Sequence, residues 1–290
     1  MPVPALPFFN ITFQGCPMRI VRWVIAASAI VAGAFAAPAT ASVLFAAAPA
    51  AVNYVAVGDS FSSGNGGGSY ADTSCYRSAN GFPALYSKAA KVDSFTNAAC
   101  SGAVTGDVIN QQVRSLSAST TLVTITIGGN DAGFPATMRA CTKGSGTGQD
   151  CYDGIAAGRN FIKNGAAAKL DATYAAIKKA APNARLVVLG YPRLFERGGC
   201  SNAIWYVPLE ARDGINAASD EINTVISARA KAAGADYVDV RSNFSGHGAC
   251  GNSPWIREAR ILPSEQAESY HPTATGYRSG YLPALQGAVG

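Results

Sequence analysis

Histidine is scarce in this chain, which has only two among its 290 residues, His247 and His271. No CxxC pair occurs among the cysteines, and neither histidine has a suitable spacing from them, so the sequence argues against a zinc site. No charged or low-complexity linker and no internal repeat divides the chain, which argues against an array of small modules. Any imidazole base must therefore be one of two residues.

The first 41 residues are predicted to be targeting sequence. Arg19 and Arg22 precede an apolar stretch, residues 23–37, and the small residues 39–41 follow it, as in a secretory signal. We assign residues 1–41 to an N-terminal extension plus signal peptide, with cleavage after Ala41 or as late as residue 51. The predicted location is extracellular.

The leader leaves two points open. Residues 1–17 fit no part of a signal, whereas Met18 stands directly before its charged region, so we hypothesise that Met18 is the true start. The alternative to cleavage is a retained membrane anchor, although Pro38 and Pro49 interrupt the apolar run.

Residues 42–290 are predicted to form a single domain. Cleavage after Ala41 removes two of the 23 basic residues and none of the 18 acidic ones, which leaves 21 minus 18, or +3. So small a charge implies no nucleic-acid partner. The remaining length is ample for one hydrophobic core.

Cysteine usage supports export. Cys16 lies in the leader, and six cysteines remain, an even set that predicts disulfides in a secreted chain. Six cysteines can pair in many ways. The expected topology favours pairs whose partners follow neighbouring strands or close one loop: Cys75 with Cys100, Cys141 with Cys151, and Cys200 with Cys250.

The pattern of apolar residues predicts an α/β fold. Helical spacing of apolar residues occurs over residues 170–181 and 215–226, and the glycine-rich stretches 64–68 and 144–148 indicate loops. Alternation of strands and helices predicts a doubly wound, mainly parallel five-stranded sheet with helices on both faces. The five expected strands are apolar, β-branched runs at residues 52–57, 94–98, 122–127, 185–189 and 237–240.

Ser60 is the first candidate for chemistry. It follows the apolar run 52–57 and a Gly58-Asp59 turn, which places it at the carboxyl edge of the sheet, where reacting groups gather. A serine hydroxyl is a poor nucleophile unless a positioned base takes its proton, and His271 near the end of the chain can be that base. The triplet alone could equally be a turn with a helix cap.

Two other strand ends are expected to meet Ser60. The Gly128-Gly129-Asn130-Asp131 string follows the strand at 122–127, and its Asn130 could donate its amide N–H to a developing oxyanion. Cys100-Ser101-Gly102-Ala103 follows the strand at 94–98 and could bring the Gly102 N–H to the same place. Three strand ends that converge on one point are more specific than any one of them.

These blocks, in this order, resemble those of secreted SGNH/GDSL hydrolases, of the lipase and esterase group common in actinobacteria such as Streptomyces. The resemblance covers nearly all of residues 52–290, and His271-Pro272 ahead of a closing helix is its last block. It implies a three-layer, flavodoxin-like fold that uses no cofactor or metal. It also implies Ser60 as nucleophile, His271 as base, and an oxyanion hole formed by the N–H groups of Ser60 and Gly102 with the Asn130 side chain.

One position departs from the family pattern. An aspartate usually lies three residues before the histidine, and Glu268 stands there in this chain. In the similar actinobacterial group a main-chain carbonyl often orients the imidazole, and that carbonyl would be the one of Ser269. Either partner could fix the tautomer and stabilise the imidazolium. We predict a Ser60–His271 dyad with the Ser269 carbonyl, and keep Glu268 as the alternative.

The remaining polar candidates are given structural roles. His247 lies in a glycine-rich loop before Cys250 and is the competing base, but such a histidine is more often structural. Asp59 and Asp131 are expected to brace their turns through backbone hydrogen bonds.

The predicted function is a secreted, cofactor-free serine carboxylic ester hydrolase, a lipase or esterase with phospholipase as an option, that acts as a monomer through an acyl-enzyme on Ser60. Its partner is a small-molecule or lipid ester, with at most transient contact with lipid surfaces. The alternatives are a carbohydrate acetylesterase of the same fold and a non-catalytic binding protein. Apolar residues near strand ends could line an acyl groove or belong to the core: Phe134, Leu194, Phe195 and Trp205.

Overall fold

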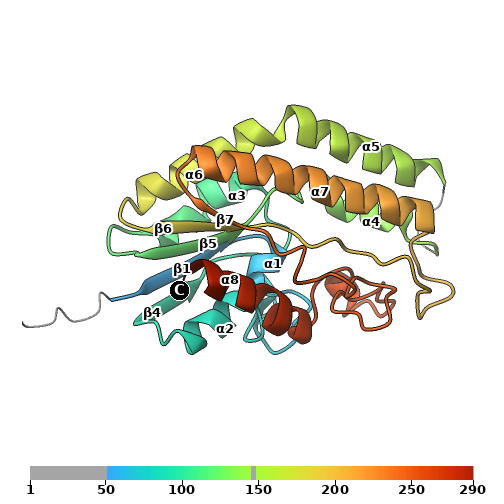
Figure 1. Cartoon of the computed structure of the whole chain (residues 1–290), viewed down its shortest axis with the longest axis horizontal. Coiled ribbons are helices and arrows are strands. Elements are labelled where there is room, and N and C mark those ends of the chain that lie inside the picture. The colour runs from blue at the N-terminus through green and yellow to red at the C-terminus, as the bar shows by residue number, and fades with distance from the viewer. Residues whose placement is uncertain (1–50, 145–147, 290) are drawn as a thin grey trace, which may run out of the picture. The chain divides into compact units, whose positions relative to one another are not determined.

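A computed structural model describes residues 51–144 and 148–289, and a five-stranded parallel sheet lies at the centre of their fold (Figure 1). The strand order is β4-β1-β5-β6-β7, with every neighbouring pair parallel. All five predicted strands are present. Their bounds are β1 (Asn53–Gly58), β4 (Ser94–Asn97), β5 (Leu122–Thr126), β6 (Arg185–Leu189) and β7 (Asp236–Val238).

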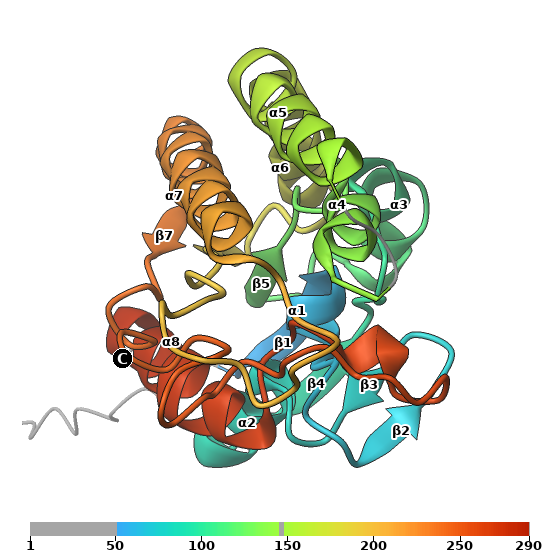
Figure 2. The ribbon, with the colours of Figure 1, turned by 90° about the vertical axis from the view of Figure 1, so that its right-hand side faces the viewer.

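Helices cover both faces of the sheet, as predicted (Figures 1 and 2). One face carries α3 (Thr105–Asn110), α4 (Phe134–Cys141), α5 (Gln149–Asn164), α6 (Ala166–Ala180) and α7 (Leu209–Ala232). The other carries α2 (Phe82–Ala89) and α8 (Leu282–Val289). The two expected amphipathic faces belong to α6 and α7.

The central strands are buried because both faces of the sheet are covered. Every residue of β5 is buried, including Thr124 and Thr126, as expected for a strand inside a parallel sheet. The two threonine hydroxyls are not left unpaired, since Tyr54 bonds to Thr124 at 2.7 Å and Ser62 to Thr126 at 2.8 Å. Apolar runs thus build the core while a few polar side chains bond across it.

Several short elements were not predicted. A two-stranded antiparallel sheet joins β2 (Tyr70–Asp72) and β3 (Arg77–Ser78), and neither strand has a β-branched or alternating apolar run that would signal it. The others are α1 (Ser60–Ser63), η1 (Gln112–Ser115), η2 (Gln266–Glu268) and a π-helical segment, Gly276–Tyr281, that runs into α8.

The three disulfides pair as predicted, Cys75 with Cys100, Cys141 with Cys151 and Cys200 with Cys250. The expected N-terminal extension, signal peptide and Met18 start lie outside the described residues, as do residues 145–147 of the second glycine-rich loop. Within residues 51–144 and 148–289, no helix combines the length and the apolar character that crossing a bilayer requires.

Candidate active site

Ser60 begins α1 directly after β1, at the carboxyl edge of the sheet. The turn between them depends on Gly58, which has φ +118° and sits where a Cβ atom would lie 2.2 Å from the Thr126 carbonyl oxygen. Asp59 then caps α1 by accepting a hydrogen bond from the Phe61 N–H at 3.0 Å. Glycine and aspartate therefore fix the backbone on which the Ser60 hydroxyl is presented.

The His271 ring joins the Ser60 hydroxyl to a main-chain carbonyl. Its Nε2 lies 2.7 Å from Ser60 Oγ, and its Nδ1 lies 2.9 Å from the Ser269 carbonyl oxygen. A carbonyl can only accept, so Nδ1 carries the proton and Nε2 is the free acceptor. The ring is thus in the tautomer that can receive the serine proton.

Burial keeps this imidazole neutral. His271 is buried, and desolvation lowers its pKa to about 4, against the opposing effect of backbone hydrogen bonds at Ser269 and Glu268. In the part of the chain that the structure describes, no carboxylate bonds to the ring to raise that pKa. At neutral pH the ring is therefore ready to accept a proton.

The Glu268 carboxylate bonds to groups other than the His271 ring. It accepts a hydrogen bond from the Tyr70 hydroxyl at 2.7 Å and forms an ion pair with the Arg257 guanidinium at 3.3 Å. Its contact with His271 is through the main chain, where the Glu268 carbonyl accepts from the His271 N–H at 3.2 Å. Glu268 thus holds neighbouring segments together, and the Ser269 carbonyl occupies the place that a triad acid would take.

Gly102 and Asn130 border the same cleft as Ser60 and His271. Gly102 has φ +86°, with nothing within 4 Å of the position of a Cβ atom. Asn130 Nδ2 donates one hydrogen bond to the Ala103 carbonyl at 2.9 Å, which fixes the amide and leaves its second N–H for another acceptor. The predicted site residues thus come together from three strand ends.

The bracing roles expected for the two aspartates are also seen. Asp131 accepts from the Thr105 N–H at 2.9 Å and from its hydroxyl at 2.7 Å, which ties the Asn130 turn to α3. Asp59 is fully buried, and desolvation raises its pKa to about 6 although hydrogen bonds from Tyr191, Thr126 and Phe61 favour the carboxylate.

Two residues near the site had no sequence signal. Asn65 donates from Nδ2 to Ser101 Oγ at 3.0 Å and to the Ala267 carbonyl at 2.7 Å, and so connects three segments around the cleft. Tyr191 follows β6, and its hydroxyl bonds to Asp59. Both act through partners far away in sequence, which no local pattern reveals.

Two openings meet at Ser60. One is a largely apolar cavity between α4, α5 and α7, whose lining includes Leu194 together with Phe134, Met138, Ile155, Ile162, Ile215 and Ile222. The other is the more polar cleft, lined by Trp205, Arg139 and Tyr270. Three of the four expected lining residues border one of these spaces. Phe195 does not, because it is buried against Tyr270 with ring centroids 5.5 Å apart.

His247 is remote from this arrangement. Its ring stacks on Trp255 at 3.6 Å between centroids, and its Nδ1 lies 2.7 Å from the Ser253 carbonyl. It belongs to the loop that ends at Cys250, so it shapes that loop and has no contact with Ser60.

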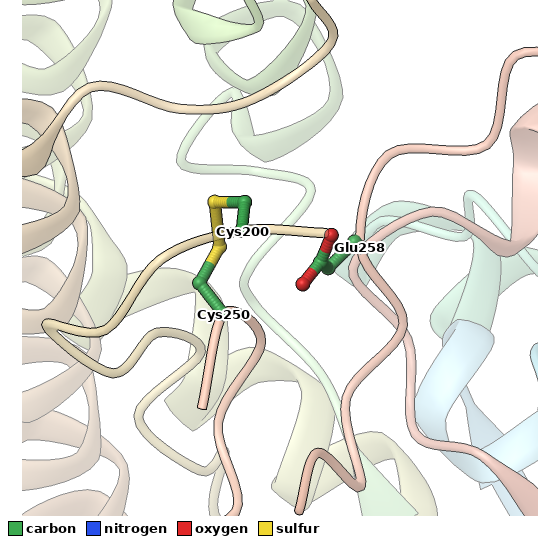
Figure 3. A group of neighbouring side chains, drawn as sticks. All are labelled: Cys200, Cys250 and Glu258. Atoms are coloured by element: carbon green, nitrogen blue, oxygen red, sulfur yellow. A yellow bond between two sulfur atoms is a disulfide. The ribbon is translucent and has the colours of Figure 1, made fainter. Parts of the chain in front are cut away.

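One group of side chains in the described residues has the proximity of a metal site. Ligand atoms of Cys200, Cys250 and Glu258 lie within 4.8 Å of one another, but Figure 3 shows the two sulfur atoms joined in a disulfide. Metal binding needs free thiolates, so the group cannot hold an ion in this form. Glu258 instead accepts hydrogen bonds from the Ser201 N–H and hydroxyl.

Comparison with known proteins identifies relatives of this chain. The model of the GDSL-like lipase/acylhydrolase family matches residues 56–279. Lipase 1 of Streptomyces coelicolor is 45% identical over 275 residues, which cover 94% of this chain and all of that protein.

Two solved structures are also similar. The extracellular lipase of Streptomyces rimosus is 45% identical, with a TM-score of 0.75 over 82% of this chain and all of that one. Phospholipase A1 of Streptomyces albidoflavus NA297 is 41% identical, with a TM-score of 0.77 over 83% of this chain and all of that one.

Proposed function

The chain belongs to the GDSL-like lipase/acylhydrolase family and is a serine ester hydrolase, and we propose that Ser60 and His271 are its catalytic dyad. The observation that carries the proposal is the hydrogen-bonded series from Ser60 Oγ through the imidazole to the Ser269 carbonyl. A nucleophile, a base and a group that orients the base are the parts that acyl transfer requires.

The reaction begins when the Ser60 oxygen attacks the ester carbonyl carbon and its proton passes to His271 Nε2. The negative charge that develops on the carbonyl oxygen is stabilised by the N–H groups of Ser60 and Gly102 and the Asn130 amide. His271 then gives its proton to the leaving alcohol as the acyl-enzyme forms. Water, activated by the same imidazole, attacks the acyl group and releases the carboxylic acid and free Ser60.

The imidazolium formed on the way is stabilised without a carboxylate. The Ser269 carbonyl accepts a hydrogen bond from its Nδ1–H, and a carbonyl dipole is a weaker partner for a cation than an anion is. The low pKa of His271 therefore favours transfer of the proton to the leaving group. The main role of the Ser269 carbonyl is to orient the ring.

Each of the two openings is proposed to hold a different part of the substrate. The apolar cavity suits a fatty acyl chain, since its lining offers few polar partners. The more polar cleft receives the alcohol part. We propose that the enzyme is a secreted monomer that hydrolyses lipid esters without a cofactor, and its similarity to a phospholipase A1 extends the proposal to the acyl esters of phospholipids. An acetylesterase would not need so apolar a cavity.

Labelling by an organophosphonate tests the catalytic assignment. One label per chain on Ser60 is expected, with none in Ser60→Ala, and this variant should lose about 10³-fold or more in ester hydrolysis. Labelling elsewhere, or retention of more than about a tenth of the activity, would rule out Ser60. Rates across p-nitrophenyl esters of increasing length, beside an acetylated sugar, test the division of the substrate. Preference for the sugar would favour the acetylesterase.

A further inference from the structure

Large apolar side chains are exposed mainly in two short segments of the described chain. Ile204 is 68% exposed, Ile261 50% and Leu262 56%, and Leu209 follows Ile204 closely at 39%. The one other large apolar residue with comparable exposure among the described residues is Tyr152 on α5, at 42%. Single exposed apolar residues are ordinary, but a cluster calls for a reason.

The two segments lie against each other. The Glu258 carboxylate accepts from the Ser201 N–H at 2.9 Å and from its hydroxyl at 2.6 Å, and one surface cavity is lined by Asn202 from the first segment and by Ile261 and Leu262 from the second. Figure 3 shows Glu258 beside the Cys200–Cys250 disulfide. We call Ile204, Ile261 and Leu262 the apolar rim.

The segment that carries Ile204 is held in place. Arg212 on α7 donates to the Val207 carbonyl at 2.7 Å and to the Gly198 carbonyl at 2.7 Å, and the disulfide fixes Cys200 between them. These bonds anchor both sides of the exposed segment. The Ile204 side chain is therefore held in an exposed position, because the anchored backbone prevents it from packing against the core.

The rim borders the entrance to the proposed active site. Trp205 and Arg260 line the cleft that contains Ser60 and His271, and they are the chain neighbours of Ile204 and Ile261. Figure 2 looks onto this end of the sheet, where the gold segment passes below α7 and the orange-red segment lies below α4. None of the three rim residues lines the cleft itself, so they are free for contact with something outside it.

The second segment carries no excess of positive charge. Residues 257–268 hold two arginines and three glutamates, and Arg257 pairs with Glu268 at 3.3 Å and Arg260 with Glu265. This segment therefore offers no cationic patch to attract an anionic surface. Its complement is an apolar material beneath neutral or zwitterionic groups.

From these observations we propose that the apolar rim docks the enzyme on the surface of an aggregated, uncharged or zwitterionic lipid. The proposal rests on the function proposed above and names the physical state in which the substrate is taken. Insertion of the three side chains would bring the cleft to the lipid, and each buried side chain should raise the partition coefficient by roughly tenfold.

Vesicles of a dialkyl ether phosphatidylcholine test the docking, because the enzyme has no ester to cleave in them. Ile204→Ser, Ile261→Ser, Leu262→Ser and the triple variant are compared with wild type by co-sedimentation. Each single change should weaken binding by roughly tenfold and the triple by about 10²-fold or more. Tyr152→Ser, a matched loss of one exposed apolar side chain on α5, should bind within about twofold of wild type. Ile261→Leu should also retain binding.

Hydrolysis of soluble p-nitrophenyl acetate separates docking from catalysis, and all rim variants should stay within about twofold of wild type. Unchanged vesicle binding by the triple variant would overturn the rim while leaving the ester hydrolase intact. Binding that requires anionic lipid and disappears in high salt would overturn the uncharged surface. A wild-type dimer that the triple variant dissociates would show that the rim serves a second copy. Failure of the wild type to cleave any ester, whatever its vesicle binding, would instead refute the proposed function.

Discussion

The Tyr191 hydroxyl donates a hydrogen bond to the buried Asp59 carboxylate at 2.5 Å, although 132 residues separate the two in sequence. The same hydroxyl accepts from the Gly129 N–H at 3.2 Å. Asp59 precedes Ser60 and Gly129 precedes Asn130, so one phenol connects the turn of the proposed nucleophile with the turn of the proposed oxyanion donor. Tyr191 is thereby a positioning residue for two parts of the site.

Tyr191→Phe should therefore lower kcat by roughly tenfold with little change in KM, since small misplacements of reacting groups are costly and the ring still lines the apolar cavity. Tyr174→Phe is the matched control, because the buried Tyr174 hydroxyl has no hydrogen-bond partner in the structure; its kcat should not change. Equal effects of the two substitutions on kcat would show that Tyr191 does no more than fill space.

This connection illustrates what the sequence could not predict. The five parallel strands follow from apolar, β-branched runs, and even the least apolar of them, β4, is found at residues 94–97. Because the carboxyl ends of such strands share one edge, the sequence also predicts that Ser60, Gly102 and Asn130 meet. Local pattern was sufficient for these three residues, each of which follows its own strand.

Residues that act through partners far away in the sequence could not be predicted from it. Asn65 looks like one more polar residue in a glycine-rich turn, and Tyr191 like an aromatic residue after a strand, until folding supplies their partners. The place of Glu268 was undecided for the same reason, because Tyr70 and Arg257 compete for its carboxylate. For Phe195 the sequence left groove and core open, because an apolar side chain near a strand end can turn into either, and in the structure it is buried.

Asn130→Ala should mainly lower kcat, by roughly 10² to 10³, because a preorganised donor acts where charge develops in the transition state. KM should change little. Asn130→Asp keeps the shape but replaces the donor with a carboxylate, so it should be at least as damaging. Steady-state kinetics on a soluble ester would measure both. A rise in KM alone would make Asn130 a substrate-binding residue.

The buried Asp59 and His271 should give opposite pH dependences of stability. Burial lowers the pKa of His271 to about 4, so the unfolded chain binds its proton first, and the stability this group contributes above about pH 6.5 is lost as the pH falls to 4. Burial raises the pKa of Asp59 to about 6, so the stability that its protonated form contributes below about pH 4 is lost as the pH rises to 6. Between about pH 4 and pH 6, the two groups change the free energy of unfolding in opposite directions.

Urea unfolding at pH 4 to 6.5 tests this opposition. In wild type the free energy of unfolding should change little with pH, because the two groups oppose each other. In Asp59→Asn it should increase as the pH rises, by up to roughly 3 kcal/mol for the His271 pKa shift of about 2.5 units. His271→Ala should show the reverse slope. Parallel curves for all three proteins would contradict the assigned pKa directions.

The acid limb of activity should report His271 in the same way. Since burial lowers the pKa of His271 to about 4, kcat/KM for a soluble ester should hold down to about pH 5 and then decline with an apparent pKa near 4. A decline centred on the ordinary histidine value of about 6.5 would mean that the imidazole is solvated or paired with a carboxylate in the working enzyme.

Glu268→Gln decides between a dyad and a triad. The glutamate side chain bonds to Tyr70 and Arg257, while the Ser269 carbonyl accepts the hydrogen bond from His271 Nδ1–H. A glutamine at position 268 can still accept from Tyr70. We expect less than a tenfold loss in kcat, or about 1.4 kcal/mol in transition-state stabilisation. Removal of an orienting triad carboxylate would cost about 10⁴ instead. His271→Ala should abolish activity and His247→Ala should leave it unchanged, so a large loss in Glu268→Gln, set between these two controls, would replace the Ser269 carbonyl with Glu268 as the partner of His271.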